Sequence, residues 1–222
     1  MKPPRLDARL KQIADCVPYC DLAADIGADH GKLSAWLLLT GRCRRMIVSD
    51  VSEVSRAKAR ALFHRLGLTD RVSISAADGL YALTEPVDAV MISGMGGGSI
   101  AGILSQEVGL HGAELILGPH TEFPRLRETL ARRGYRIVHE YVVRAEGRFY
   151  LVWHARPGEM RLSAKERAIG VNLRATRTAS PADYLRWQLE VAGSWQGAEA
   201  EAIRGWIKEM IADETGDNPG GL

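Results

Sequence analysis

Two carboxylates and two glycines share one short turn near the start of the chain, in the segment Asp25-Ile26-Gly27-Ala28-Asp29-His30-Gly31. The apolar residues 22–24 before this turn predict a buried strand, and residues 32–38 after it predict a helix. A strand, a glycine turn and a helix in this order form a corner that binds anions and nucleosides. Glycine lets the backbone approach a ligand closely, and the first turn of the helix has free N–H groups.

The charges of this turn indicate which ligand it suits. A dinucleotide-binding turn has the pattern G-x-G-x-x-G and faces phosphates, whereas Asp25 and Asp29 would repel a pyrophosphate. Carboxylates suit a ligand with a cationic ammonium or sulfonium group, so the turn favours S-adenosyl-L-methionine over NAD. The residues that we expect to bind this cofactor here are Asp25, Gly27, Asp29, His30 and Gly31. For His30, a side-chain hydrogen bond that caps the turn is the alternative.

Acidic residues also follow the second and third predicted strands. Asp50 could accept hydrogen bonds from a ribose diol, and Asp78, beside Gly79, could accept one from the exocyclic amine of adenine. Ligands of open α/β sheets bind beyond the carboxyl ends of the strands, so these groups would meet the acidic turn at one edge. An aspartate at a strand end often only caps a turn or a helix, which is the structural alternative for each.

A cluster of glycines follows the fourth predicted strand. Gly94, Met95 and Gly96, with the next glycine, would give a bare backbone ledge where a planar substrate could approach the methyl donor. We therefore add Gly94, Met95 and Gly96 to the expected cofactor site. Met95 could pack against a base, or it could only fill the core.

Three residues are candidates for a direct part in catalysis: Asp29, Met95 and His120. Asp29 could stabilise positive charge that develops on a methylated base. His120 ends the fifth predicted strand and could reach an incoming base, although a loop histidine without a chemical role is the alternative.

The elements that must position these residues alternate along the chain. Strands are predicted over about 21–26, 46–50, 72–75, 87–92 and 115–117, separated mostly by helix-like segments, and a hairpin is predicted from 135–143 and 149–155. Five β-then-α units closed by an antiparallel hairpin are typical of the Class I methyltransferase fold. This is a Rossmann-like α/β architecture with a seven-stranded sheet.

The chain changes character after residue 157. We expect a cofactor-binding methyltransferase domain over residues 1–157 and a C-terminal helical, coiled-coil-like extension over residues 158–222. Residues 163–174 are helix-like, and an apolar stripe from residue 182 to about 214 predicts a second helix, so that the two would form a helix hairpin. Gly193 or Gly205 could interrupt the second helix. The ending after residue 215 is predicted to be disordered.

Charge is spread unevenly along a chain whose net charge is only +2. Residues 1–158 carry 21 basic and 17 acidic side chains, residues 159–177 carry five and two, and residues 178–222 carry three and eight. A polyanion such as RNA would therefore meet the first domain and the start of the extension. Mixed charge on a solvated surface is the alternative explanation.

Other bulk features narrow the class of protein. The chain has no run of about 18 apolar residues and no apolar leader, so we expect no membrane segment and a cytoplasmic location. Cys16, Cys20 and Cys43 are odd in number and lack a second Cys/His pair, which favours free thiols over a zinc site. We expect no bound metal, and the sequence leaves the oligomeric state open.

Three motifs carry a resemblance to a known family. The segment from Asp25 to His30, the Gly94-Met95-Gly96-Gly97 run, and Leu126-Arg127 followed by Gly134-Tyr135 resemble the bacterial tRNA (adenine-22-N1)-methyltransferase family. The opening residues, Leu6-Asp7 and Arg9-Leu10, are similar to its first helix, and the resemblance spans about residues 5–155. Family members commonly have Gln-Pro-Asn where this chain has Gly118-Pro119-His120, so the target base would be held differently here.

The resemblance implies an activity. It implies transfer of a methyl group from S-adenosyl-L-methionine to N1 of an adenine in tRNA, on a Class I core with a helical C-terminal extension. A Class I methyltransferase that acts on a small molecule or a protein is the first alternative, and a non-catalytic RNA-binding module with this fold is the second. A nicotinamide oxidoreductase is disfavoured by Asp29 and the missing third glycine of the dinucleotide fingerprint.

Overall fold

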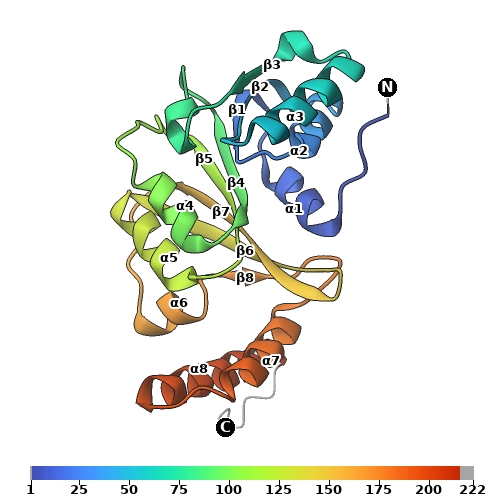
Figure 1. Cartoon of the computed structure of the whole chain (residues 1–222). Helices are drawn as coiled ribbons and strands as arrows, with labels where there is room; N and C mark the ends of the chain where they lie inside the picture. The colour runs from blue at the N-terminus through green and yellow to red at the C-terminus, as the bar shows by residue number, and fades with distance from the viewer. Residues whose placement is uncertain (1, 216–222) are drawn as a thin grey trace.

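The computed structural model describes residues 2–215, which form one mixed sheet with helices on both faces (Figure 1). The strand order is β3-β2-β1-β4-β5-β7-β6-β8. The strands are β1 (Cys20–Ile26), β2 (Cys43–Ser49), β3 (Val72–Ser75), β4 (Ala89–Met95), β5 (Glu114–Pro119), β6 (Tyr135–Ala145), β7 (Arg148–Pro157) and β8 (Leu173–Arg174). The helices are α1 (Ala8–Cys16), α2 (Lys32–Leu39), α3 (Glu53–Arg65), α4 (Gly97–Leu104), α5 (Phe123–Arg132), α6 (Ala164–Ala168), α7 (Pro181–Ala192) and α8 (Ala198–Thr215).

The first five strands are parallel to one another, and β7 pairs antiparallel with both β5 and β6. This confirms the predicted doubly wound sheet with a terminal hairpin. The predicted number of seven strands is wrong, because β8 adds an eighth strand that runs parallel to β6. A two-residue strand leaves no period-two pattern in the sequence, and it lies at the end of the segment 163–174 that we expected to be helical. In that segment only α6 is a helix.

The third β-then-α unit also differs from the prediction. Between β3 and β4 the chain forms only a short 3₁₀ helix, Gly79–Ala82, and no α-helix. Pro86 follows within four residues, so this segment is too short for a full α-helix before β4 begins. The strand and helix order around it is otherwise as expected.

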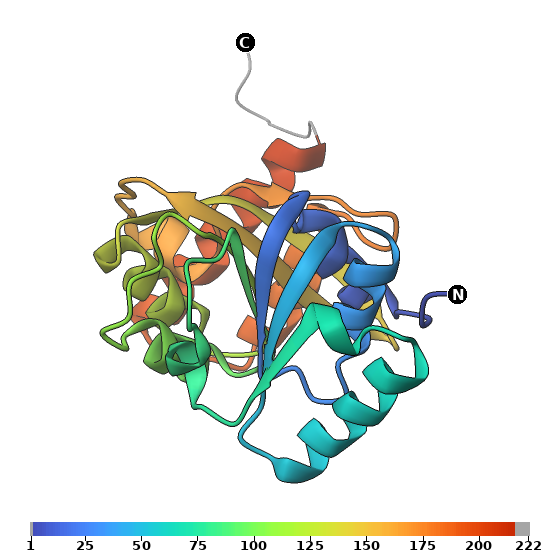
Figure 2. The same ribbon diagram turned by 90° about the horizontal axis from the view of Figure 1, so that it is seen from above.

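Two apolar clusters lie on opposite faces of the sheet, and Figure 2 shows helices against both of these faces. One contains side chains of α4 and α5, and the other contains side chains of α1, α2 and α3. Successive side chains of a strand point to opposite faces. Leu22, Ala24 and Ile26 therefore face the first cluster, while Ala23 faces the second. The same alternation turns Asp25 toward α2.

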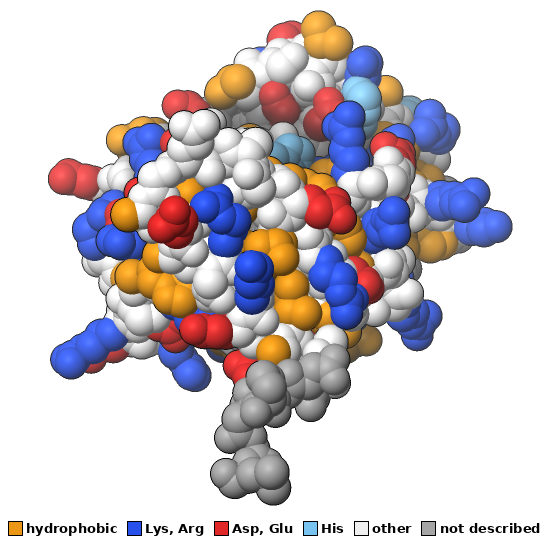
Figure 3. Space-filling view, turned by 90° about the horizontal axis from the view of Figure 1, so that it is seen from below, with side chains coloured by type: hydrophobic (Ala, Val, Ile, Leu, Met, Phe, Trp, Pro, Cys, Tyr) orange, Lys and Arg blue, Asp and Glu red, His pale blue; other side chains and the backbone are white. Residues whose placement is uncertain are grey.

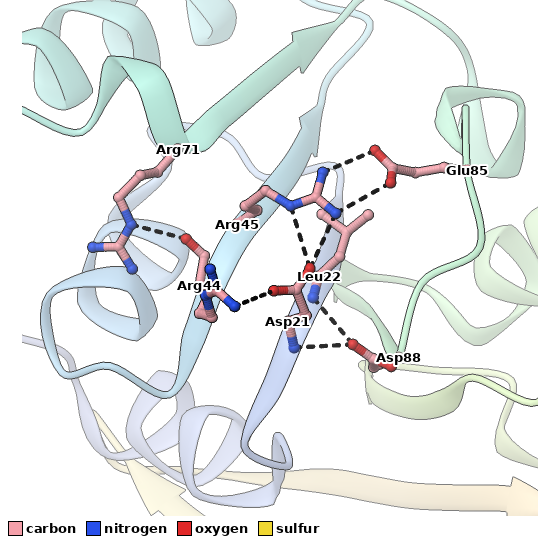
Figure 4. A network of polar contacts seen from close by, with 7 residues as sticks. All are labelled: Asp21, Leu22, Arg44, Arg45, Arg71, Glu85 and Asp88. Carbon is pink, nitrogen blue, oxygen red and sulfur yellow. Dashed lines mark hydrogen bonds and ion pairs between the residues drawn. The ribbon is translucent and has the colours of Figure 1, made fainter.

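The amino ends of the strands are closed by paired charges (Figure 4). Arg45 of β2 contacts Asp21 at 3.1 Å and Glu85 at 3.1 Å. The Asp88 carboxylate accepts hydrogen bonds from the backbone N–H groups of Asp21 and Leu22, at 3.0 and 3.1 Å. These charged groups are therefore paired with one another. Ligands of open α/β sheets bind at the opposite, carboxyl ends of the strands, so we expect the functional site there.

The extension after residue 158 contains the helix hairpin α7–α8, which lies beneath the sheet in Figure 1. The single helix that we expected after residue 182 is therefore wrong, because the chain breaks at residues 193–197 and forms both helices of the hairpin there, whereas α8 continues through Gly205. They share a small apolar cluster that includes Ile169, Leu185 and Ile207. Tyr184 of α7, only 1% exposed, belongs instead to the main core. The segment predicted to be disordered lies outside the described residues.

A buried ion pair connects the extension to the core. The side chains of Arg127 on α5 and Glu140 on β6 are fully buried and form two hydrogen bonds, at 2.9 and 2.7 Å. Arg127 also donates to the backbone carbonyls of Arg167 and Ile169, at 2.9 and 3.2 Å. Glu140 accepts a hydrogen bond of 2.8 Å from the Val171 N–H. Both charges are thus satisfied only while residues 167–171 stay in place.

Breaking this pair from one side should strongly destabilise the fold. We expect Arg127→Met to lower the free energy of unfolding by about 3–5 kcal/mol, because it leaves the Glu140 carboxylate buried without its cation. Urea denaturation measures the change. The control is Arg186→Ala, whose exposed ion pair with Asp183 should contribute less than about 1 kcal/mol. Equal effects of the two substitutions would show that the buried pair does not hold the extension.

Candidate active site

A cavity of about 410 Å³ opens at the carboxyl ends of β1, β4 and β5, beside α1. Five of its residues come from the acidic turn or from the strand before it, and the others come from α1, α2, β4 and the end of β5. The lining residues are Arg9, Leu10, Asp25, Gly27, Ala28, Asp29, His30, Lys32, Leu33, Ser93, Gly94 and His120. The sheet therefore brings together residues that are up to 111 positions apart in the chain.

The backbone of the acidic turn is held by β2. Gly27 and Ala28 both donate to the Ser49 carbonyl, at 2.8 and 3.0 Å. Gly27 has φ +71° and Asp29 has φ +48°, so the chain turns sharply above the strand. The Asp50 carboxylate accepts hydrogen bonds from the Asp29 N–H at 3.0 Å and the Ser52 N–H at 2.8 Å. Asp50 therefore caps the turn, which was the structural alternative for this residue. Each of its carboxylate oxygens still has a second lone pair that can accept another hydrogen bond.

Asp25 is the most deeply buried carboxylate of the cavity, at 4% exposed. Its Oδ2 accepts a hydrogen bond of 2.6 Å from the Ser34 hydroxyl of α2. Burial raises the pKa of Asp25 to about 6, against the effect of the Ser34 hydrogen bond. Near neutral pH the cavity thus contains a desolvated negative charge, which attracts a cationic ligand group. Lys32, which sequence reasoning missed, also lines the cavity and suits a carboxylate.

Asp29 and His30 lie at the mouth of the cavity. Asp29 accepts a hydrogen bond of 3.2 Å from the Ser55 hydroxyl, and its other oxygen is 3.2 Å from His30 Nδ1. His30 thus lines the cavity and also contacts the side chain of its neighbour Asp29.

Six of the predicted residues lie outside the cavity lining: Gly31, Asp50, Asp78, Gly79, Met95 and Gly96. A Cβ at Gly31 would be 2.7 Å from the Phe63 ring, and one at Gly79 would be 2.5 Å from the Gln106 side chain, so both glycines permit close packing. Asp78 is exposed. The Met95 methyl lies above Gly27, 2.8 Å from where a Cβ would stand. The cofactor-binding role of every predicted residue stays a prediction, and so do the catalytic roles of Asp29, Met95 and His120.

The glycine run after β4 is mostly covered by the loop before α5. Gly97 donates a hydrogen bond of 2.8 Å to the Thr121 carbonyl, and Gly98 donates one of 3.2 Å to Glu122. A Cβ at Gly96 would be 2.9 Å from Thr121 Oγ1. Only Gly94 of this run faces the cavity, so the ledge that we expected there is limited to this residue.

His120 lies at the end of β5 and is joined to α1 by Arg9. Arg9 Nη1 is 3.1 Å from His120 Nε2. A guanidinium has donors only, so Nε2 accepts and the neutral ring carries its proton on Nδ1. Burial and the nearby Arg9 charge lower the pKa of His120, which agrees with the neutral form. Arg9 was not predicted as a site residue, although its helix carried part of the resemblance.

Within residues 2–215 the structure shows no group of three or more His, Cys, Asp or Glu side chains placed to hold a metal ion. No helix of that range is both long and apolar enough to cross a membrane.

This geometry suits a methyl donor, and the sheet order is that of a Class I methyltransferase fold. The sequence matches the methyltransferase domain family over residues 6–153, and the chain belongs to that family. A curated relative from Bacillus subtilis, the tRNA (adenine(22)-N(1))-methyltransferase, is 32% identical over 160 residues, which cover 70% of this chain and 66% of that protein.

Solved structures of other proteins are also similar to this chain. A Streptococcus pneumoniae protein crystallised with S-adenosyl-L-methionine is 28% identical, covers 93% of this chain and 100% of its own, and superposes with a TM-score of 0.85. A Rossmann-superfamily protein from Streptococcus agalactiae is 29% identical, with coverages of 94% and 98% and a TM-score of 0.83. The Class I fold and the C-terminal extension are thus common to this chain and its structural relatives.

Replacing Asp25 with a neutral residue should make the fold more stable and cofactor binding weaker. Because the folded protein raises the pKa of Asp25 from 3.8 to about 6, the ionised side chain opposes folding, and this cost grows as pH rises through that range. We expect Asp25→Asn to raise stability at pH 7.5 by about 1–3 kcal/mol, and to weaken binding of S-adenosyl-L-methionine at least about tenfold. Thermal unfolding and calorimetric titration measure the two effects.

The wild-type protein provides the internal control for Asp25. Its affinity for the cofactor should fall as pH is lowered through about 6, and Asp25→Asn should lose this pH dependence. An unchanged affinity and pH profile in the variant would contradict a cation-binding role for Asp25.

Proposed function

We propose that this protein transfers a methyl group from S-adenosyl-L-methionine to N1 of an adenine in tRNA. The half-enclosed cavity above Gly27 is the observation that supports it most directly, since its buried Asp25 fits the cationic amino group of the cofactor and its Lys32 fits the carboxylate. The Bacillus subtilis relative has this activity by name, and a structural relative was solved with the cofactor. We further propose that residues 1–157 form the catalytic domain, and that the protein acts in the cytoplasm, where tRNA is available.

The side chains present suit a reaction that needs little acid–base help. Bound S-adenosyl-L-methionine would supply an electrophilic methyl group on its sulfonium. Adenine N1 has an available lone pair, so the protein needs mainly to orient the base, which is worth up to about 7–11 kcal/mol. Asp29 at the cavity mouth could stabilise the positive charge of an N1-methylated base. His120 in its neutral form adds no positive charge beside it.

The test is methyl transfer from labelled S-adenosyl-L-methionine to unmodified bulk tRNA, followed by nucleoside analysis. Label in 1-methyladenosine supports the proposal. Cofactor binding without label in RNA would instead favour a small-molecule or protein methyltransferase, and absence of cofactor binding would favour a non-catalytic RNA-binding module.

Binding of tRNA should depend strongly on salt. Basic and apolar side chains are interspersed on the face that carries the C-terminal hairpin (Figure 3), and the chain up to residue 177 has an excess of basic residues. We expect the Kd for tRNA to rise at least about tenfold between 50 and 200 mM salt, because phosphate contacts release counterions. Filter binding at several salt concentrations measures it. A salt-independent Kd would contradict a phosphate-dominated contact, and the cofactor Kd serves as the control.

A further inference from the structure

A second, smaller cavity adjoins the methyl-donor cavity. It measures about 240 Å³, and His120 lines both. Five aromatic side chains line it: Phe123 of α5, Phe149 and Tyr150 of β7, and Tyr184 and Trp187 of α7. The core domain and the C-terminal hairpin thus both contribute to one aromatic pocket next to the reaction site.

We propose that this aromatic pocket receives the target adenine, and that Tyr150 and Trp187 are base-binding residues. This inference rests on the proposed function, because it assigns the acceptor side of the same site. It also gives the C-terminal extension a part in binding the base, beyond any contact with the tRNA backbone.

The aromatic walls suit a planar base. The Trp187 ring centroid is 5.7 Å from that of Phe149 and 5.8 Å from that of Tyr184, at tilts of 40° and 32°. Trp187 is nevertheless 40% exposed, so a large aromatic surface remains uncovered at the pocket. RNA-binding proteins stack unpaired bases on such rings.

The Tyr150 side of the pocket is held by contacts with His120 and with Arg9 of α1. The Tyr150 ring lies edge-on to His120, with 5.6 Å between centroids, and the Arg9 guanidinium is 5.4 Å from the centre of the Tyr150 ring. Arg9 also forms the hydrogen bond to His120 Nε2. These three side chains therefore form one assembly at the junction of the two cavities, where a base must lie if it is to approach the methyl donor.

The size and charge of the aromatic pocket match one nucleotide. Its volume is below the range of about 300–1,000 Å³ that is usual for drug-sized ligands, and it suits a single base better than a peptide segment. Arg148 lines the pocket, and the Arg144 guanidinium lies 5.5 Å from the centre of the Phe149 ring. These two cations suit the phosphates of a nucleotide whose base has left the RNA stack, as enzymes that modify bases require.

The hairpin that carries Trp187 is held in place by the core. Tyr184, one helical turn before Trp187, is 1% exposed and packs in the main apolar cluster. Its ring also contacts Phe149, with 6.0 Å between centroids. Trp187 is therefore presented from a fixed helix and not from a loop.

Kinetics of four variants test the assignment. Stacking on an aromatic side chain is worth about 1–3 kcal/mol per base, so Trp187→Ala and Tyr150→Ala should each lower kcat/KM for tRNA by about 5- to 150-fold. Trp187→Phe should retain most of the activity. The matched control is Trp195→Ala, on the same hairpin and 47% exposed but outside the aromatic pocket, which should change kcat/KM less than twofold. The Kd for S-adenosyl-L-methionine should stay unchanged in all four.

Photocrosslinking provides a readout that does not depend on activity or on the stability of a variant. A tRNA with 8-azidoadenosine at the methylated position should crosslink the wild-type protein within the peptides that contain Tyr150 or Trp187, as mass spectrometry would show. Crosslinks confined to other peptides would overturn the assignment, and so would equal losses in Trp187→Ala and Trp195→Ala. If the wild-type protein methylates no tRNA, the proposed function itself fails, which is distinct from a methylating enzyme that tolerates Trp187→Ala.

Discussion

The charges of Arg127 and Glu140 are buried where water cannot solvate them, and the fold must satisfy every hydrogen-bonding group that they carry. Residues 167–171 supply two carbonyls and one N–H for this purpose. The start of the C-terminal extension is therefore tied to the core, even though the hairpin beyond it has a small apolar cluster of its own. This constraint holds the start of the extension against α5 and β6, while Tyr184 and Trp187 of α7 contact Phe149 of β7 and complete the aromatic pocket beside the cofactor cavity.

In the cofactor cavity, a group that suits ligand binding lowers the stability of the fold. A buried carboxylate at Asp25 costs folding free energy, as its raised pKa indicates. Ser34 offsets part of that cost with a hydrogen bond. Asp50 is used differently, because its backbone contacts hold the turn in which Asp29 adopts a positive φ. The two carboxylates thus have different roles: Asp50 caps the turn, and Asp25 gives the cavity a buried negative charge.

The predictions from sequence succeeded where neighbouring residues carry the information. The strand, glycine turn and helix around Asp25 are contiguous, so their pattern predicted both the fold and the cavity. The contact of Arg9 with His120 spans 111 positions, and Trp187 meets Phe149 across two elements, so no local pattern reveals either contact. We predicted that the glycine run near Gly97 forms a ledge for a ligand. In the structure, most of these glycines leave room for the loop before α5.

In the proposed function, the cavity above Gly27 binds the methyl donor with its reactive end toward His120. A crystal structure with S-adenosyl-L-homocysteine tests this most directly. We expect the amino acid end of the ligand to lie over Gly27 near Asp25, and its sulfur to face the junction with the aromatic pocket. A ligand bound elsewhere, or one with its adenine at Asp25 and its sulfur turned away from His120, would contradict the account.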